Sequence, residues 1–74
     1  MARLRPLPAR RVLVALEELG FRIVRQKGSH VFLRHTDRRT TVVPVHPRED
    51  IGKGLLRKII RDAGVDVDEF MSHV

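Results

Sequence analysis

The sequence predicts a single α+β domain over residues 1–74, in which two amphipathic helices flank three antiparallel strands. Apolar residues recur with helical spacing near both ends of the chain, and strand-like runs of alternating polarity lie between them. Gly, Pro and Asp residues separate these segments. A chain of 74 residues has room for only a small core, and the absence of cysteine excludes disulfides and thiolate metal sites.

The first helix is expected over residues 8–19. Its apolar positions have the i, i+3, i+4, i+7 spacing that places side chains on one face of a helix. These positions are Val12, Ala15, Leu16 and Leu19. Pro8 suits the first helical turn, and Gly20 suits the left-handed position just after the last one. Residues 1–6 are expected to be flexible.

A β-hairpin is expected between residues 21–27 and residues 30–35. Both runs are rich in β-branched and aromatic residues, and only Gly28 and Ser29 separate them. A two-residue type II′ turn is the simplest connection, because glycine readily adopts the positive φ of its first position.

Regular alternation sorts the hairpin side chains onto two faces, with Lys27 opposite His30 and Arg25 opposite Phe32. One face carries Ile23, Arg25, Lys27, His30, Phe32 and Arg34. The other carries Val24, Gln26, Val31, Leu33 and His35. We assign the second face to the core because its aliphatic residues are less interrupted by charge. Phe32 is expected to serve packing more than base stacking.

A turn at residues 36–39 precedes a third strand over residues 40–45, and Pro44 suits a sheet edge because it cannot donate a ladder hydrogen bond. Asp50 is expected to cap a second amphipathic helix. The apolar stripe of this helix consists of Leu55, Leu56, Ile59, Ile60 and Ala63.

Gly64 ends the second helix, and Asp66 with Glu69 has the spacing of a capping box that opens a short last helical turn. The resulting order is helix, three strands, helix. Two amphipathic helices then cover one face of a three-stranded antiparallel sheet and leave the other face open. Double-stranded-RNA-binding domains have this α-β-β-β-α arrangement.

Charge is distributed unevenly along the chain. Residues 1–48 contain eleven Lys and Arg against three Asp and Glu, or +8, whereas residues 49–74 contain four against six, or −2. A basic surface attracts polyanions, so RNA binding is assigned to the first two-thirds of the chain. A solvated surface that aids solubility and an acidic protein partner are the alternatives. The apolar runs are too short to span a membrane, and we expect a soluble, cytoplasmic protein.

His30 is the candidate catalytic residue. RNA is cleaved without a metal when a base removes the proton from a 2′-hydroxyl, which then attacks the adjacent phosphate, and histidine exchanges protons near neutral pH. Lys27 and Arg25 would hold the phosphate and offset the charge that develops on its oxygens. Ser29 would serve as a turn residue or donate a hydrogen bond to the phosphate. A histidine with no role beyond the turn is the alternative.

The remaining candidates are weaker. His46, at the end of the third strand, is a candidate second acid, whereas His35 points to the opposite face and His73 lies in the C-terminal tail. A zinc site needs three or four converging ligands, so no metal or other cofactor is expected. The predicted RNA contacts are basic residues of the strands, the second turn and the second helix. They are Arg25, Lys27, Arg34, Arg38, Arg39, Lys53 and Arg57.

Three stretches in this order resemble the HicA family of toxins. They are RQKGSHVFLRH, TVVPVHP and IGKGLLRKIIRDAG, and the resemblance runs from about Leu7 to Phe70. In that family a Gly-Ser-His hairpin is followed by a Pro-x-His strand end and a Gly-x-Leu-Arg-x-Ile helix. The resemblance implies a double-stranded-RNA-binding-like fold and an mRNA endonuclease that inhibits translation and growth. It also implies an antitoxin partner, HicB, that covers the active site.

By position, the resemblance assigns the family's catalytic histidine to His30, in a turn built by Gly28 and Ser29. Pro44 and His46 match the strand-end pattern, which does not by itself imply catalysis by His46. The chain departs from the family pattern in two places. Leu55 stands where the family often has Thr, and Pro47 stiffens the loop.

Two other functions remain open on sequence alone. A non-catalytic RNA-binding module would use the same basic face. A DNA-binding or ribosome-associated accessory protein is a third interpretation, for which the chain lacks a recognition-helix signature.

Overall fold

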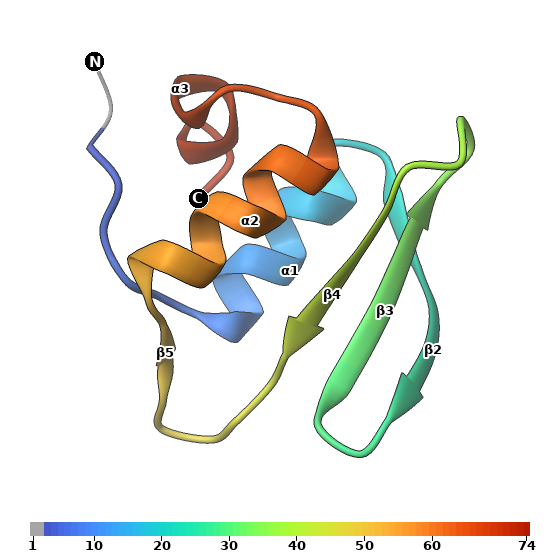
Figure 1. The fold of residues 1–74 in the computed structure, drawn as a ribbon, viewed down its shortest axis with the longest axis horizontal. Coiled ribbons are helices and arrows are strands. Elements are labelled where there is room, and N and C mark those ends of the chain that lie inside the picture. The colour runs from blue at the N-terminus through green and yellow to red at the C-terminus, as the bar shows by residue number, and fades with distance from the viewer. Residues whose placement is uncertain (1–2) are drawn as a thin grey trace.

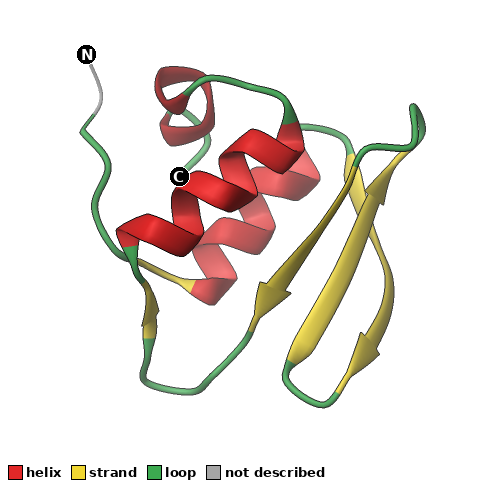
Figure 2. Cartoon of the chain, in the orientation of Figure 1, coloured by secondary structure: helices red, strands yellow, loops and turns green. Residues whose placement is uncertain are grey.

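The computed structural model describes residues 3–74, which form one three-stranded sheet, one two-stranded sheet and three helices (Figures 1 and 2). The elements in chain order are β1 (Leu7–Pro8), α1 (Ala9–Glu18), β2 (Phe21–Lys27), β3 (His30–His35), β4 (Thr40–Pro44), β5 (Asp50–Ile51), α2 (Lys53–Ala63) and α3 (Val67–Met71). The larger sheet is antiparallel with strand order β2-β3-β4, and α1 and α2 both pack against one face of it. The predicted α+β class is confirmed.

Helix α1 matches its predicted range within one residue at each end. Pro8 is its N-cap, and Val12, Ala15 and Leu16 have no exposed surface. Gly20 has φ +102°, as predicted for the position after the helix. A Cβ at Gly20 would lie 2.7 Å from Nε2 of His35, so this glycine also permits a close approach between α1 and β3.

The β2–β3 hairpin has the predicted two-residue turn. Gly28 has φ +58° and Ser29 has a negative φ, the pattern of a type II′ turn. Lys27 pairs with His30 across the hairpin. The Gln26 side-chain amide donates to the carbonyl of Gly28 at 3.2 Å and braces the turn.

The predicted register fails beyond Arg25, because β2 contains a bulge at Val24. Ile23 pairs with Leu33, whereas a regular hairpin would place Val24 there. The prediction that Val24 faces the core is therefore wrong, and its side chain is 50% exposed. The prediction that Ile23 shares a face with His30 is wrong for the same reason.

The bulge has a plain energetic cause. In a regular strand Phe21 would fall on the open face and Arg22 on the core face. The extra residue reverses both, so that Phe21 is 1% exposed beneath the helices and Arg22 pairs with Arg34 on the open face. Burying a phenylalanine removes more apolar surface from water than burying a valine does.

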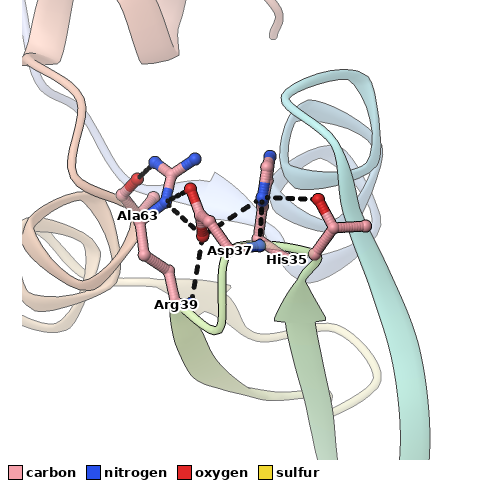
Figure 3. A network of polar contacts seen from close by, with 5 residues as sticks. His35, Asp37, Arg39 and Ala63 are labelled. Carbon is pink, nitrogen blue, oxygen red and sulfur yellow. Dashed lines mark hydrogen bonds and ion pairs between the residues drawn. The ribbon is translucent and has the colours of Figure 1, made fainter.

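Strand β4 lies at one edge of the sheet, and Pro44 ends it opposite His30, as predicted for an edge. The turn before β4 is tied to the end of α2 (Figure 3). Arg39 donates from Nε to both carboxylate oxygens of Asp37, at 3.0 and 2.9 Å, and from Nη1 to the carbonyl of Ala63.

The sequence did not predict the small β1–β5 sheet, in which Leu7 pairs with Ile51 and Pro8 with Asp50. Asp50 was expected to cap α2, and this prediction is wrong. The N-cap of α2 is Gly52, with no side-chain cap. Asp50 lies in β5 instead, two residues before that position.

The second helical stripe is buried except at Leu55, which is 38% exposed. Its four buried members are Leu56, Ile59, Ile60 and Ala63. Gly64 ends α2 with φ +73°, as predicted. Asp66 caps α3 by accepting the backbone N–H of Glu69 at 2.7 Å, and Phe70 is fully buried. The short last helix is therefore part of the core.

The N-terminal segment contributes Leu4, which is 8% exposed and belongs to the core cluster. Flexibility of residues 1–6 stays a prediction, and Met1 and Ala2 lie outside the described residues. Among residues 3–74, no helix has the length and apolar character needed to cross a bilayer.

Candidate nucleic-acid interface

The sheet face opposite the helices presents cations without carboxylates. None of β2, β3 and β4 contains Asp or Glu. Arg25, Lys27 and Arg34 reach this face as predicted, and the bulge adds Arg22 to them. We call this surface the open face. The attraction that it exerts on an anion is not offset by acidic groups on the same strands.

His30 lies at one end of the open face, next to the hairpin turn. Lys27 is its direct cross-strand neighbour on β2 and Pro44 its neighbour on β4. Directly opposite residues have Cα atoms about 5 Å apart. The imidazole is exposed and has no hydrogen-bond partner within residues 3–74. The side chain is therefore accessible to a substrate.

Arg25 is held in place beside His30 by an aromatic ring. Its guanidinium carbon lies 4.4 Å from the ring centroid of Phe32, within the range of a cation–π contact. Phe32 was expected to serve core packing, and this is wrong, because its ring lies on the open face under Arg25 and outside the buried cluster. The contact orients one cation on the diagonal from His30.

The predicted second acid, His46, lies just beyond the third strand. The backbone N–H of Val45 donates to the carbonyl of Ser29 at 2.6 Å, which extends the β3–β4 ladder up to the hairpin turn. His46 follows directly and lines a hollow with Pro8 and Arg10 at the start of α1. His46 therefore lies near the β2–β3 turn, because it follows the last hydrogen bond between Val45 and Ser29. The hollow that it lines, however, is formed with the start of α1.

The other predicted RNA contacts are not all on the open face. Lys53 and Arg57 are exposed on α2, which covers the opposite face of the sheet. Arg39 is engaged with Asp37 and Ala63, and its guanidinium carbon also lies 5.4 Å from the Phe21 ring centroid. The hydrogen bonds from Arg39 hold the pKa of the Asp37 carboxyl below its ordinary value.

The remaining histidines are tied to other parts of the fold. Nδ1 of His35 lies 3.1 Å from a carboxylate oxygen of Asp37, and its ring meets Phe21 edge-on. Nδ1 of His73 lies 2.9 Å from the Glu18 carboxylate. The described residues contain no group of three His, Cys, Asp or Glu side chains placed to hold a metal ion.

Fold and surface together define a small α+β domain with the α-β-β-β-α arrangement and an exposed histidine at the end of a basic sheet face whose strands carry no carboxylate. A family model described as the HicA toxin of bacterial toxin-antitoxin systems matches residues 9–65, from α1 through α2 and the loop after it. The chain therefore belongs to the HicA toxin family, and it is the toxin of a toxin–antitoxin pair. Comparison with curated proteins finds no match.

Proposed function

We propose that this toxin is a metal-independent endoribonuclease that cleaves mRNA in the cytoplasm, with His30 as general base and acid. The observation that carries the proposal is the exposed His30 imidazole on a cationic sheet face without carboxylates. Membership of the HicA family supports the same conclusion. Cleavage of mRNA accounts for inhibition of translation and growth by one small domain.

The open face supplies the base and the cations that the reaction needs. A nitrogen of His30 removes the proton of a 2′-hydroxyl, the 2′-oxygen bonds to the adjacent phosphorus, and the bond from phosphorus to the 5′-oxygen breaks. Lys27 and Arg25 offset the charge that develops on the phosphate oxygens. The 5′-oxygen receives a proton from the protonated His30, from Lys27, from His46 or from water. The products end in a 2′,3′-cyclic phosphate and a 5′-hydroxyl.

The test is His30→Ala, assayed for RNA cleavage in the presence and absence of a chelator, with growth on expression as a second readout. Loss of general acid–base catalysis lowers the rate by about 10²–10⁴-fold. His73→Ala is the matched control, because this histidine pairs with Glu18 on α1. A single 2′-deoxynucleotide at the cleavage site removes the attacking hydroxyl and is expected to block the wild-type enzyme.

Two results would overturn the proposal. Wild-type protein that leaves RNA intact under all these conditions, yet binds it, is a non-catalytic RNA-binding module. Cleavage that persists in His30→Ala, or that stops when the metal is removed, assigns the chemistry to other groups.

We also propose that the antitoxin is a HicB-like protein whose acidic surface covers the open face. Carboxylates are the complement of the cations there, and coverage would exclude RNA from His30. Co-expression with the antitoxin is expected to restore growth, and addition of the purified antitoxin is expected to stop RNA cleavage. An antitoxin that binds tightly while RNA cleavage continues would place its contact elsewhere.

A further inference from the structure

A hollow of about 740 Å³ lies at the end of the sheet away from the β2–β3 turn. Three arginines line it, Arg22 from β2, Arg34 from β3 and Arg38 from the turn before β4, together with Val24, Thr36 and Thr40. The two turns lie at opposite ends of the sheet (Figure 1), so this hollow and His30 lie at opposite ends of β3. Within residues 3–74, none of the three arginines forms an ion pair.

Three features that lower local stability lie around this hollow: a like-charge pair, a left-handed residue and a β-bulge. Arg22 and Arg34 are direct cross-strand partners, and like charges directly opposite each other destabilise a sheet. Arg38 has φ +77°, a left-handed conformation that is unfavourable for a residue with a side chain. The bulge at Val24 interrupts the ladder and turns Arg22 toward the open face. Such local conflicts are characteristic of functional sites.

An anion in the hollow would resolve the charge conflict. Guanidinium groups bind phosphate through paired, parallel hydrogen bonds, and the hydroxyl group of Thr40 is a further donor. The five residues from His30 to Arg34 are separated by four steps, which span about 14 Å of strand β3. A stacked nucleic-acid strand rises 3.4 Å per nucleotide, so this span corresponds to roughly four nucleotides.

We infer that this hollow is a second phosphate-binding site, which holds the RNA strand about four nucleotides from the phosphate that is cleaved at His30. The inference rests on the proposed ribonuclease function for the identity of the anion. RNA is favoured over an acidic protein segment because a single strand whose cleaved phosphate lies at His30 reaches the hollow along β3 within about four nucleotides. The enzyme would then require a length of RNA on one side of the cut and discriminate against short fragments.

The experiment compares two triple variants of equal charge. Arg22→Gln/Arg34→Gln/Arg38→Gln removes the cations of the hollow, and Arg3→Gln/Arg5→Gln/Arg11→Gln removes three exposed cations outside the three-stranded sheet. Both are combined with His30→Ala, so that the RNA stays intact during binding. Affinity is measured over a range of salt concentrations for two RNAs, a dinucleotide and an oligomer of about eight nucleotides, which is twice the estimated span.

For the longer RNA, the hollow variant is expected to lose about 0.7 from the slope of log affinity against log salt, because it loses one phosphate contact and each such contact on a single strand contributes about 0.7. The control triple variant is expected to keep the slope. If the hollow variant does not fold, Arg38→Gln alone replaces it, with an expected loss of up to about 0.7. Equal slopes for the hollow and control variants would overturn the inference.

Cleavage by the wild-type protein separates this inference from the proposed function. Equal slopes together with normal RNA cleavage would refute the second site and leave the ribonuclease standing. A reduced slope in a protein that cannot cleave RNA would uphold the phosphate site and refute the enzyme. If the hollow variant keeps its RNA slope but escapes neutralisation by the antitoxin, the hollow is a protein contact and the inference fails.

Discussion

Replacing Arg38 by glycine is expected to stabilise the protein and weaken its binding to RNA. A left-handed conformation costs a residue with a side chain about 1–2 kcal/mol, and Arg38 has φ +77°. Glycine avoids this cost but gives the unfolded chain more freedom, which offsets about 0.4–1 kcal/mol. The central values give a net gain in the free energy of unfolding of about 0.8 kcal/mol, which corresponds to a rise in Tm of roughly 3–6 °C for a domain of this size.

Arg48→Gly provides the matched control, because Arg48 is also left-handed, with φ +67°, and lies in the loop between β4 and β5. Both substitutions are expected to raise Tm in thermal unfolding followed by circular dichroism. Only Arg38→Gly is expected to reduce the salt slope of RNA binding, by up to about 0.7. A fall in Tm for Arg38→Gly would refute the strain argument. An equal loss of slope in both variants would refute the assignment of Arg38 to a specific phosphate contact.

Three further predictions concern stability. Asp37→Asn is expected to lower Tm at pH 7, because the hydrogen bonds from Arg39 stabilise the Asp37 carboxylate and depress its pKa. Their contribution to stability is present above about pH 4 and is lost as the pH falls through the pKa of the folded state. A Tm difference between Asp37→Asn and wild type that persists in strong acid would contradict this. Phe70→Ala is expected to lower the free energy of unfolding in urea by about 3–5 kcal/mol, since the ring is fully buried, and a loss below about 1 kcal/mol would show that α3 is dispensable. Gly20→Ala is expected to lower Tm more than Gly28→Ala does. Both glycines have a positive φ, but only at Gly20 would the added Cβ meet a neighbouring side chain, at 2.7 Å. Equal losses in Tm would refute the role of that contact.

The features that sequence predicted correctly depend on neighbours along the chain. Helical spacing placed Val12 and Leu16 in the core, and a glycine that needs positive φ marked the hairpin turn at Gly28. The pairing of Lys27 with His30 follows from the two-residue turn alone. The basic surroundings of His30 were therefore predictable without knowledge of the tertiary structure.

The bulge at Val24 was not predicted, because it is decided by what the helices cover. Strict alternation requires only the strand itself, whereas the preference for burying Phe21 arises from its contact with the core. A signal was nevertheless present in the sequence. Two consecutive aliphatic residues, Ile23 and Val24, interrupt the alternation of apolar and polar residues. At this point the core-facing positions change from odd-numbered to even-numbered residues. Reading that change would have placed Arg22 on the open face.

Two other features that the sequence did not reveal have long-range causes, the β1–β5 pairing and the contacts of Arg39 within the fold. The β1–β5 pairing joins segments about 43 residues apart, and strands of two residues leave no periodicity to detect. Arg39 was predicted to contact RNA from its charge alone. Its bond to the carbonyl of Ala63 depends on the end of α2 reaching the β3–β4 turn, which no local pattern encodes.

The bulge in β2 also bears on the behaviour of the protein in concentrated solution. Strands β2 and β4 are the two free edges of the sheet, where unpaired backbone groups invite other chains to add strands. The irregular backbone at Val24 interrupts one edge, and Pro44, which lacks an N–H donor, ends the other. The sheet that carries the open face is thereby protected against edge-to-edge aggregation, so an oligomer that forms by sheet extension is not expected even when the antitoxin is removed.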